Sequence, residues 1–563
     1  MKRICCAILL LTVEASMAVE FPPEVPAGMP VTAAEKSGYL STTLYADVMA
    51  FIAAMQQRDP DIRVETFGMS GEGRELPLVI LGPDGGTTPE SSRRSGLPVV
   101  FIMANIHAGE VEGKEAALML LRDLCSTRRK LRRDMTILIA PIYNADGNEA
   151  ISISHRTTQN GPLNGVGQRE NAQGLDLNRD YMKLESPEAR GLVQNVLARW
   201  DPLVTVDLHT TNGSYHGYSL TYSPPLNPNV PEDIVAFERE TLLPWIREQM
   251  SERYGQKTYY YGNFVNQLEP EKGWYTFDSR PRFGNNYVGL RGRFAILSEA
   301  YSYIDFRSRI KVTYEFLHTI LEAVDGNSRK MMKIAARADA RVAAGKLRKS
   351  GVRFEIAPWK EKVEILWEKS DPATASEGSP DPETGHDPET GRGLIKRTGQ
   401  IVPMRMTDFG VFQARETAAV PYAYLLSGAE VVDNLQTHGI VVETLTEDTQ
   451  LTVEDFVIAS AEHAEQAFQN HHELTLTGKW KERKDVIPRG THLVRMEQPL
   501  ARLAFYLLEP RSDDGLFAWN FFDSSVSTGE RKVVAPVRKL MKKVPLEARI
   551  MQSAVGSRQD SRQ

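Results

Sequence analysis

The N-terminal part of the chain alternates apolar runs of strand length with segments of helical periodicity. The run 98–104 is continuously apolar, and residues 111–124 directly after it place apolar side chains at helical spacing. Further strand-like runs stand at 64–68, 76–81, 135–142, 203–208 and 293–298. Helical periodicity also marks 33–58 and 186–200. Strands interspersed with helices indicate an α/β domain.

Two stretches of this part are expected to be loops. Residues 151–174 are polar and rich in Gly and Asn, and a loop of this length within a compact domain is often functional. Residues 284–289 are also rich in Gly and Asn, which predicts a loop that can lie over a site.

Beyond residue 327 the pattern changes. Residues 328–349 are basic and Ala-rich and predict a connecting helix, and short strand-like runs such as 503–508 predominate after it. Residues 431–438 favour a helix, and 381–391 repeat a short unit typical of an exposed loop. The expected organisation is a signal peptide 1–18, an α/β domain 19–327, a connecting helix 328–350, a β-rich accessory domain 351–545 and a disordered tail 546–563.

The first 18 residues read as a secretory signal peptide. Basic residues at 1–3 precede an apolar run at 4–13 and the small-residue cleavage site Ser16-Met17-Ala18. We therefore expect a secreted or periplasmic protein. Of the 3 cysteines, only Cys125 follows this segment, so the mature chain is expected to hold no internal disulfide.

Composition excludes several classes of partner. The 563 residues are 41% hydrophobic and 25% charged, with a net charge of −6, as in an ordinary soluble globular protein. The chain has no basic stripe, so a nucleic-acid partner is not expected. After the signal peptide no run is apolar and long enough to cross a bilayer, so no membrane partner is expected either. The oligomeric state stays open.

Two of the predicted strands end in a histidine. His107 and Glu110 stand between the strand 98–104 and the following helix, where open α/β sheets place their active sites. The strand 203–208 ends at His209. Two imidazoles and one carboxylate are the ligands of a catalytic zinc ion, with a further position left for water. Asp207, two residues before His209, is placed to orient an imidazole from outside the ligand shell.

Further polar residues follow in the same region. Asn178 and Arg179 together make a receptor for a carboxylate, because a guanidinium offers a fork of donors and an amide offers another. Arg156 and Arg169 are two more cations of the loop that leads to this pair. Glu299 ends the apolar run 293–298, and a carboxylate at a buried strand end is costly unless it has a partner or a function.

In this order, these motifs resemble the zinc carboxypeptidases of the carboxypeptidase A type. The turn 70–74 and the motif Asn144-Ala-Asp-Gly147 resemble the same family, and the resemblance covers roughly residues 40 to 320. It implies a single mixed sheet of the eight-stranded type, flanked by helices, with one zinc ion at its edge. It also implies a peptide substrate with a free C-terminal carboxylate, whose last amide bond is hydrolysed.

The resemblance assigns a role to each candidate residue. It carries zinc onto His107, Glu110 and His209, the general base onto Glu299, and recognition of the terminal carboxylate onto Asn178 and Arg179. For the arginine that polarises the scissile carbonyl, related cytosolic-type enzymes select Arg169, with Arg156 as the alternative. The tyrosine that caps the substrate has no clear match, and Tyr287 and Tyr275 are the candidates.

Other interpretations stay open at this point. Gly109 stands where the digestive members have Arg, which puts a digestive-type specificity in doubt. A deacylase like aspartoacylase or succinylglutamate desuccinylase shares the same ligand pattern and would cleave N-acyl amino acids. A non-catalytic protein that binds peptides or cell wall on the same fold is the alternative from another class.

Overall fold

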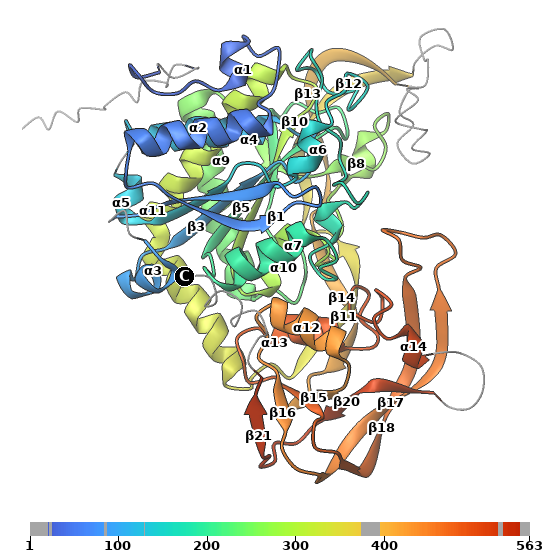
Figure 1. The fold of residues 1–563 in the computed structure, drawn as a ribbon. Helices are drawn as coiled ribbons and strands as arrows, with labels where there is room; N and C mark the ends of the chain where they lie inside the picture. The colour runs from blue at the N-terminus through green and yellow to red at the C-terminus, as the bar shows by residue number, and fades with distance from the viewer. Residues whose placement is uncertain are drawn as a thin grey trace, which may run out of the picture.

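The computed structural model of the chain describes residue 21 and residues 25–83, 87–128, 130–372, 395–526 and 533–551 (Figure 1). Its N-terminal part is built on an eight-stranded sheet in the order β1-β2-β4-β3-β5-β10-β6-β7. The strands are β1 (Arg63–Met69), β2 (Glu75–Leu81), β3 (Val99–Ala104), β4 (Thr136–Ala140), β5 (Val204–Thr211), β6 (Leu220–Ser223), β7 (Thr258–Tyr260) and β10 (Phe294–Tyr301). The expected fold class is confirmed.

The centre of the sheet is parallel and its borders are mixed. β4, β3, β5 and β10 run parallel to one another, whereas β1, β2 and β6 pair antiparallel with their neighbours towards the centre. β3 and β4 are buried along their whole length, as expected for parallel strands covered on both faces.

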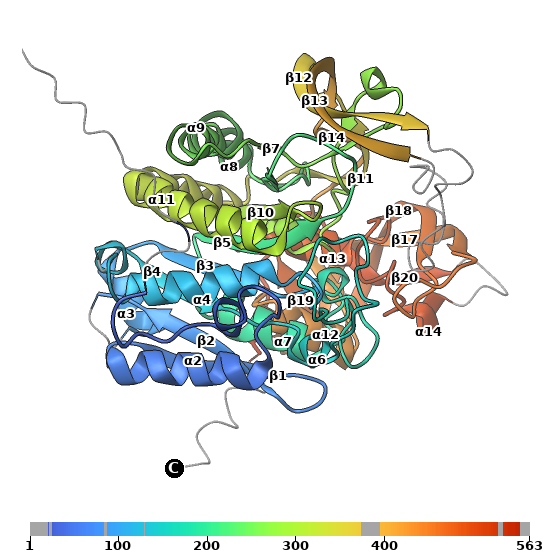
Figure 2. The same ribbon diagram turned by 90° about the horizontal axis from the view of Figure 1, so that it is seen from above.

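Helices cover both faces of the sheet. α2 (Tyr45–Arg58), α4 (Glu112–Leu124), α11 (Phe306–Ala343) and α9 (Leu243–Tyr254) lie side by side on one face (Figure 2). On the other face are α7 (Pro187–Leu192), which continues into a π-helical segment at Val193–Ala198, and α10 (Gly284–Leu290) (Figure 1). Shorter helices are α1 (Ala33–Lys36), α3 (Pro89–Ser95), α5 (Leu131–Asp134), α6 (Ala145–Glu149) and α8 (Glu232–Phe237), with 3-10 turns at Leu177–Arg179 and Pro270–Lys272.

Strand register brings the candidate side chains together at one edge of the sheet. In the parallel pair β5 and β10, His209 lies directly opposite Glu299, so both side chains leave the same face. Asp207 leaves that face too, because alternate residues of a strand share a side. Leu208 points the other way, towards α4, where a side-chain atom at Gly113 would lie 2.6 Å from its Cβ.

The C-terminal part forms three further sheets. β11 (Lys349–Ala357) pairs with β14 (Val411–Ala419), and β12 (Lys360–Pro372) pairs with β13 (Ile395–Phe409). A seven-stranded sheet has the order β18-β17-β20-β15-β19-β16-β21. Its strands are β15 (Ala423–Leu426), β16 (Glu443–Leu445), β17 (Thr449–His463), β18 (Leu474–Ile487), β19 (His492–Arg495), β20 (Val534–Leu540) and β21 (Ala548–Ile550), and α12 (Ala429–Thr437), α13 (Ala501–Leu508) and α14 (Asp523–Val526) accompany it.

Both parts share one hydrophobic core. β13 pairs with β9 (Trp274–Tyr275), which itself pairs with β8 (Asn263–Phe264), so one small sheet contains strands of both parts. α13 contacts α10 and α11, and its apolar residues belong to the same buried cluster as those of β3. The expected boundary at residue 327 lies inside α11, and the main buried cluster contains residues from both sides of it, while a smaller cluster lies within the C-terminal sheet alone.

Several local expectations differ from the structure. The run 503–508 was expected to be a strand but lies in α13, because a continuous apolar run fits a buried helix as well as a buried strand. Residues 284–289, expected to be a loop, lie in α10, where packing against β5 and β10 overrides the poor helix propensity of Gly and Asn. The connecting helix is the second half of α11.

The ends of the chain complete this comparison. The disordered tail expected from 546 is wrong for residues 548–550, because β21 pairs there with β16, and residues 552–563 lie outside the described residues. The helix expected at 431–438 is confirmed as α12. The signal peptide 1–18 and the repeat 381–391 lie outside the described residues. Among those that are described, no helix is long and apolar enough to cross a membrane.

We expect a chain that ends after residue 348 to be insoluble. Its α10 and α11 would expose the apolar surface that α13 covers, and its strand β9 would lose its partner β13. The full chain should unfold in one cooperative transition in calorimetry. Two separate transitions, or a soluble and helical truncated chain by circular dichroism, would contradict a shared core.

Candidate active site

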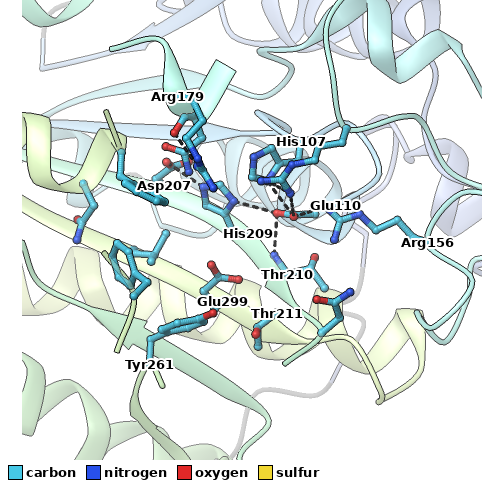
Figure 3. Close-up of a pocket in the computed structure, with 17 residues that line it drawn as sticks. His107, Glu110, Arg156, Arg179, Asp207, His209, Thr210, Thr211, Tyr261 and Glu299 are labelled. Carbon is cyan, nitrogen blue, oxygen red and sulfur yellow. Dashed lines mark hydrogen bonds and ion pairs between the residues drawn. The ribbon is translucent and has the colours of Figure 1, made fainter. Parts of the chain in front are cut away.

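One pocket of about 270 Å³ opens at the edge of the sheet where β3, β5 and β10 end (Figure 3). Every residue predicted to bind metal, to act as the base or to bind substrate lines it, except the two candidate tyrosines, Tyr287 and Tyr275. The lining residues are His107, Glu110, Arg156, Arg169, Asn178, Arg179, Asp207, His209, Thr210, Thr211, Asn212, Tyr261, Phe277, Phe283, Asn285, Leu297 and Glu299. The structure therefore gathers side chains that are up to 192 residues apart in a single cavity, from His107 to Glu299.

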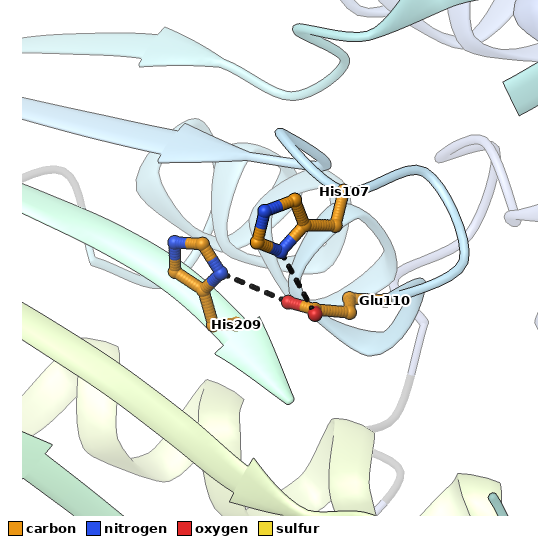
Figure 4. A group of neighbouring side chains, drawn as sticks. All are labelled: His107, Glu110 and His209. Atoms are coloured by element: carbon orange, nitrogen blue, oxygen red, sulfur yellow. Dashed lines mark hydrogen bonds and ion pairs between the residues drawn. The ribbon is translucent and has the colours of Figure 1, made fainter. Parts of the chain in front are cut away.

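Three buried side chains at the back of the pocket are arranged as metal ligands (Figure 4). His107, Glu110 and His209 each offer a ligand atom, and these atoms lie within 4.8 Å of one another. The Nδ1 atoms of both imidazoles approach the two oxygens of Glu110, each at 2.9 Å. Among the described residues this is the group of at least three His, Cys, Asp or Glu that can hold a metal ion.

Each imidazole is held from behind by a carboxylate. His107 Nε2 lies 3.0 Å from Asp176 Oδ1, and His209 Nε2 lies 3.0 Å from Asp207 Oδ2. A carboxylate on the far nitrogen fixes the ring so that Nδ1 faces the metal, as is usual for zinc ligands. The donor set and its surroundings therefore fit a zinc ion. Asp207 was anticipated from its spacing, whereas Asp176 was not.

The charges of the cluster are strongly perturbed. Burial would raise the pKa of Glu110, but Arg156 and the imidazoles of His107 and His209 lower it well below its ordinary value. Burial would lower the pKa of His209, but the carboxylates of Asp207 and Glu110 raise it well above its ordinary value. Because zinc binds the neutral imidazole, a raised pKa of His209 makes metal binding depend on pH.

Glu299 lies on β10, next to the strand that carries His209, and its carboxylate makes no hydrogen bond to another side chain among the described residues. Its side chain is half-buried, and burial raises its pKa to about 8, with a further increase from Glu110. Tyr261 lies close enough to Glu299 that their interaction, after burial, helps to raise the pKa of the phenol to about 12. This tyrosine was missed in the sequence, because nothing in its local pattern distinguishes it from Tyr259 and Tyr260.

The two candidate arginines approach the metal ligands in different ways. Arg156 makes an ion pair with Glu110 Oε1. Arg169 is fixed by Asp176, to which its Nε and Nη2 donate at 3.0 and 2.8 Å. Its third nitrogen, Nη1, lies 3.3 Å from His107 Nδ1 and 3.9 Å from Glu110. The guanidinium of Arg169 is thus oriented by one carboxylate and directs its free end to the metal site.

Asn178 and Arg179 form the opposite wall. Asn178 Oδ1 accepts a hydrogen bond from the Gly284 backbone N–H at 2.9 Å, which leaves the amide nitrogen as its donor. The guanidinium of Arg179 lies 4.0 Å above the Phe283 ring, and burial lowers its pKa to about 10. Because Asp176 is 3.8 Å away, the guanidinium has no tight carboxylate partner of its own in this wall.

Tyr287 does not belong to the pocket. It is fully buried in α10, and its hydroxyl lies 2.7 Å from His438 Nδ1, at the contact with the C-terminal part. Tyr287 is therefore not in a position to contact a substrate in this pocket. The loop predicted at 284–289 would have exposed Tyr287, but the helix that forms instead turns it into the core.

Comparisons with known proteins agree with the geometry. The family model described as zinc carboxypeptidase matches residues 48–259. Carboxypeptidase 2 of Trichophyton equinum is 24% identical over 486 residues, which span 82% of this chain and 80% of that protein. Human carboxypeptidase Z is 32% identical over 181 residues, 30% of this chain and 25% of its own length.

Solved structures with a similar arrangement include a metallo-carboxypeptidase from Burkholderia cenocepacia, with 21% identity and a TM-score of 0.38 over 50% of this chain and 69% of that one. Carboxypeptidase A from Helicoverpa armigera has 17% identity and a TM-score of 0.38 over 53% and 75%.

We expect the zinc affinity of the protein to rise with pH. Below the raised pKa of His209 a proton occupies the ligand imidazole, and zinc must displace it, so the dissociation constant should fall about tenfold per pH unit. Competition with a chelator from about pH 6 to about pH 8 measures this.

Asp207→Asn is the matched variant for this experiment. It removes a carboxylate that raises the pKa of His209, so the pH dependence should weaken, and the affinity itself should drop about 10- to 100-fold. A zinc affinity that stays constant with pH in the unmodified protein would contradict the interpretation.

Proposed function

We propose that this chain is a zinc metallocarboxypeptidase, because residues 48–259 match the zinc carboxypeptidase family and the pocket holds a group of metal ligands, and we assign a role to each side chain of that pocket. The observation that carries the proposal is the register of β5 and β10, which sets Glu299 beside the ligand His209. A base next to a metal site, opposite a receptor for a carboxylate, suits hydrolysis of the last amide bond of a peptide.

His107, Glu110 and His209 would hold the zinc ion, with their Nδ1 atoms and the Glu110 carboxylate facing it. A zinc ion bound there supplies a water of lowered pKa and a Lewis acid for the scissile carbonyl. Asp176 and Asp207 keep the two imidazoles in orientation from behind.

Glu299 is proposed as the general base. It takes a proton from the attacking water and later donates this proton to the nitrogen of the leaving amino acid. Its pKa of about 8 in the protein without metal would be lowered by a nearby dication, because positive charge favours the carboxylate. The carboxylate form of Glu299 would then be available at neutral pH.

Arg179 and Asn178 are proposed to bind the terminal carboxylate of the substrate. The guanidinium supplies paired donors and the Asn178 amide nitrogen another, so a chain end is placed with its last amide near Glu299. Arg169 would stabilise the developing negative charge on the carbonyl oxygen through Nη1, the end that Asp176 leaves free. Arg156 would neutralise Glu110.

Residues 1–18 are proposed to be a signal peptide, which implies that the enzyme acts outside the cytoplasm. The support is the order of basic, apolar and small residues in the sequence. Within the mature protein we propose that the region up to α11 carries the catalysis and that the region from β11 onwards completes its fold.

Glu299→Gln should abolish most activity without loss of zinc. The amide keeps the size of the side chain but cannot accept a proton, so kcat should fall by about 10²- to 10⁴-fold, the usual contribution of a general base. Hydrolysis of N-blocked dipeptides, followed together with zinc content, tests this.

The same assay separates the alternative deacylase. A carboxypeptidase releases the last residue of a peptide and spares the same peptide with an amidated C-terminus. If N-acyl amino acids with small acyl groups are cleaved while peptides survive, the deacylase interpretation replaces the proposal. If Glu299→Gln retains full activity, the role of the base is wrong.

Arg179→Ala should raise KM for peptides strongly and affect kcat less. The variant loses a charge-assisted pair of hydrogen bonds to the terminal carboxylate, which corresponds to about 30- to 100-fold in kcat/KM. The exposed Arg94 offers a control, because Arg94→Ala removes the same charge away from the pocket. Equal effects of both substitutions would contradict a specific role for Arg179.

A further inference from the structure

The segment that connects β17 to β18 ends in a two-residue turn that contacts Asp176, behind the active site. Its tip, residues 468–471 (the hairpin tip), is closed by backbone hydrogen bonds of 2.7 and 3.0 Å between Phe468 and His471. The central residues Gln469 and Asn470 both have positive φ, at 50° and 65°. Turns of this type favour Asn, Asp or Gly at both positions, so a glutamine here is held in an unfavourable backbone conformation.

The side chain of Gln469 has a definite partner. Its Oε1 accepts a hydrogen bond of 2.9 Å from the backbone N–H of Asp176, which precedes it by 293 residues. Asp176 is 5% exposed, so this N–H has little access to water and depends on Gln469 for an acceptor. A strained residue whose side chain satisfies a buried donor is an observation from which a function can be inferred.

Asp176 connects most of the polar groups of the site. Its Oδ1 accepts from the backbone N–H of Asn178 at 2.8 Å and lies 3.0 Å from His107 Nε2. Its Oδ2 accepts hydrogen bonds from Nε and Nη2 of Arg169. A small displacement of Asp176 therefore changes the orientation of a metal ligand and of an arginine together, and it moves the turn that carries Asn178 and Arg179.

Ion pairs fix the hairpin tip to two other segments of the N-terminal part. His471 Nε2 lies 2.7 Å from Glu185 Oε1, and Glu473 Oε1, just after the tip, lies 2.5 Å from Arg282 Nη2. The guanidinium of Arg282 lies 5.2 Å from the centre of the Phe468 ring. Arg282 directly precedes Phe283, the ring under Arg179, so the tip contacts both segments that form the receptor wall.

We propose that Gln469 is a positioning residue of the active site, through which the C-terminal part holds Asp176 in place behind His107 and Arg169. The substrate side of this inference rests on the proposed function, since it takes Arg169, Asn178 and Arg179 as the groups that bind the peptide. The metal side rests only on the contact between Asp176 and His107. The C-terminal part is then a component of the catalytic site as well as of the core.

Two substitutions at Gln469 separate its hydrogen bond from its backbone strain. Gln469→Met keeps the length of the side chain and removes the acceptor. Gln469→Gly also removes the acceptor, and it removes the strain too, because glycine adopts a positive φ readily. Asn470→Gly is the matched control in the same turn, because Asn470 is exposed and has the same sign of φ. All variants are made in the full chain and compared by thermal unfolding, zinc affinity and peptide kinetics.

Both Gln469 variants should lower kcat/KM about tenfold, mainly through KM, the size expected for one buried hydrogen bond. Their zinc dissociation constants should rise severalfold, because His107 loses a fixed partner. Asn470→Gly should match the unmodified protein in both, and Gln469→Gly should not lower the unfolding temperature.

Three results overturn the inference or separate it from the proposed function. Gln469 variants with unchanged KM and unchanged zinc affinity would overturn it. An equal loss in Asn470→Gly would also do so, because the conformation of the turn would then matter and the acceptor would not. If the unmodified protein cleaves no peptide, the proposed function fails, and the zinc affinities of the same variants still decide whether Gln469 acts on His107 through Asp176.

Discussion

Burial of charge is the constraint on which the active site depends. Glu110, Asp176 and Asp207 are each no more than 5% exposed and lie within contact distance of two imidazoles. Buried carboxylates are costly unless cations and donors surround them. In this chain His209, whose pKa is raised, and nearby arginines supply positive charge, and the carboxylates lie against the far nitrogens of both rings. The contacts between carboxylates and imidazoles thus reduce the cost of burying charge, and they also orient Nδ1 of both rings towards the metal site at Glu110.

The sheet supplies the precision that this cluster needs. Residues on strands are held by ladders of hydrogen bonds on both sides, so β5 and β10 keep His209 and Glu299 in fixed register. His107 and Glu110 follow β3, which pairs with β5 over its whole length. A metal ligand and a base on rigid neighbouring strands need little reorganisation during a reaction. The receptor wall is built differently, from turns, and it relies on side-chain contacts for its position.

This difference explains how much of the site was accessible from the sequence. Continuous apolar runs predict the strands that end at His107 and His209. Because side chains of a strand alternate between its two faces, Asp207 is predicted to lie on the same face as His209. Asp176 carries no such local signal, because its role depends on a ring 69 residues away. For the fold, the central sheet was predictable, whereas α10 and α13 form against surfaces that only the assembled molecule provides. Tyr287 was misplaced for that reason.

The C-terminal part shows what long-range packing adds to a catalytic scaffold. An isolated two-stranded hairpin as long as β17 and β18 has little stability of its own, and this one is joined to a seven-stranded sheet and anchored at its tip by His471 and Glu473. Because β13 also pairs with β9, and α13 packs against α10 and α11, the C-terminal part borders the catalytic region at several places. The hairpin tip can hold the turn that carries Asp176 in place only if the hairpin itself is rigid. The sheet behind the hairpin provides that rigidity, which is why a residue so distant in sequence can be in a position to hold the N–H of Asp176.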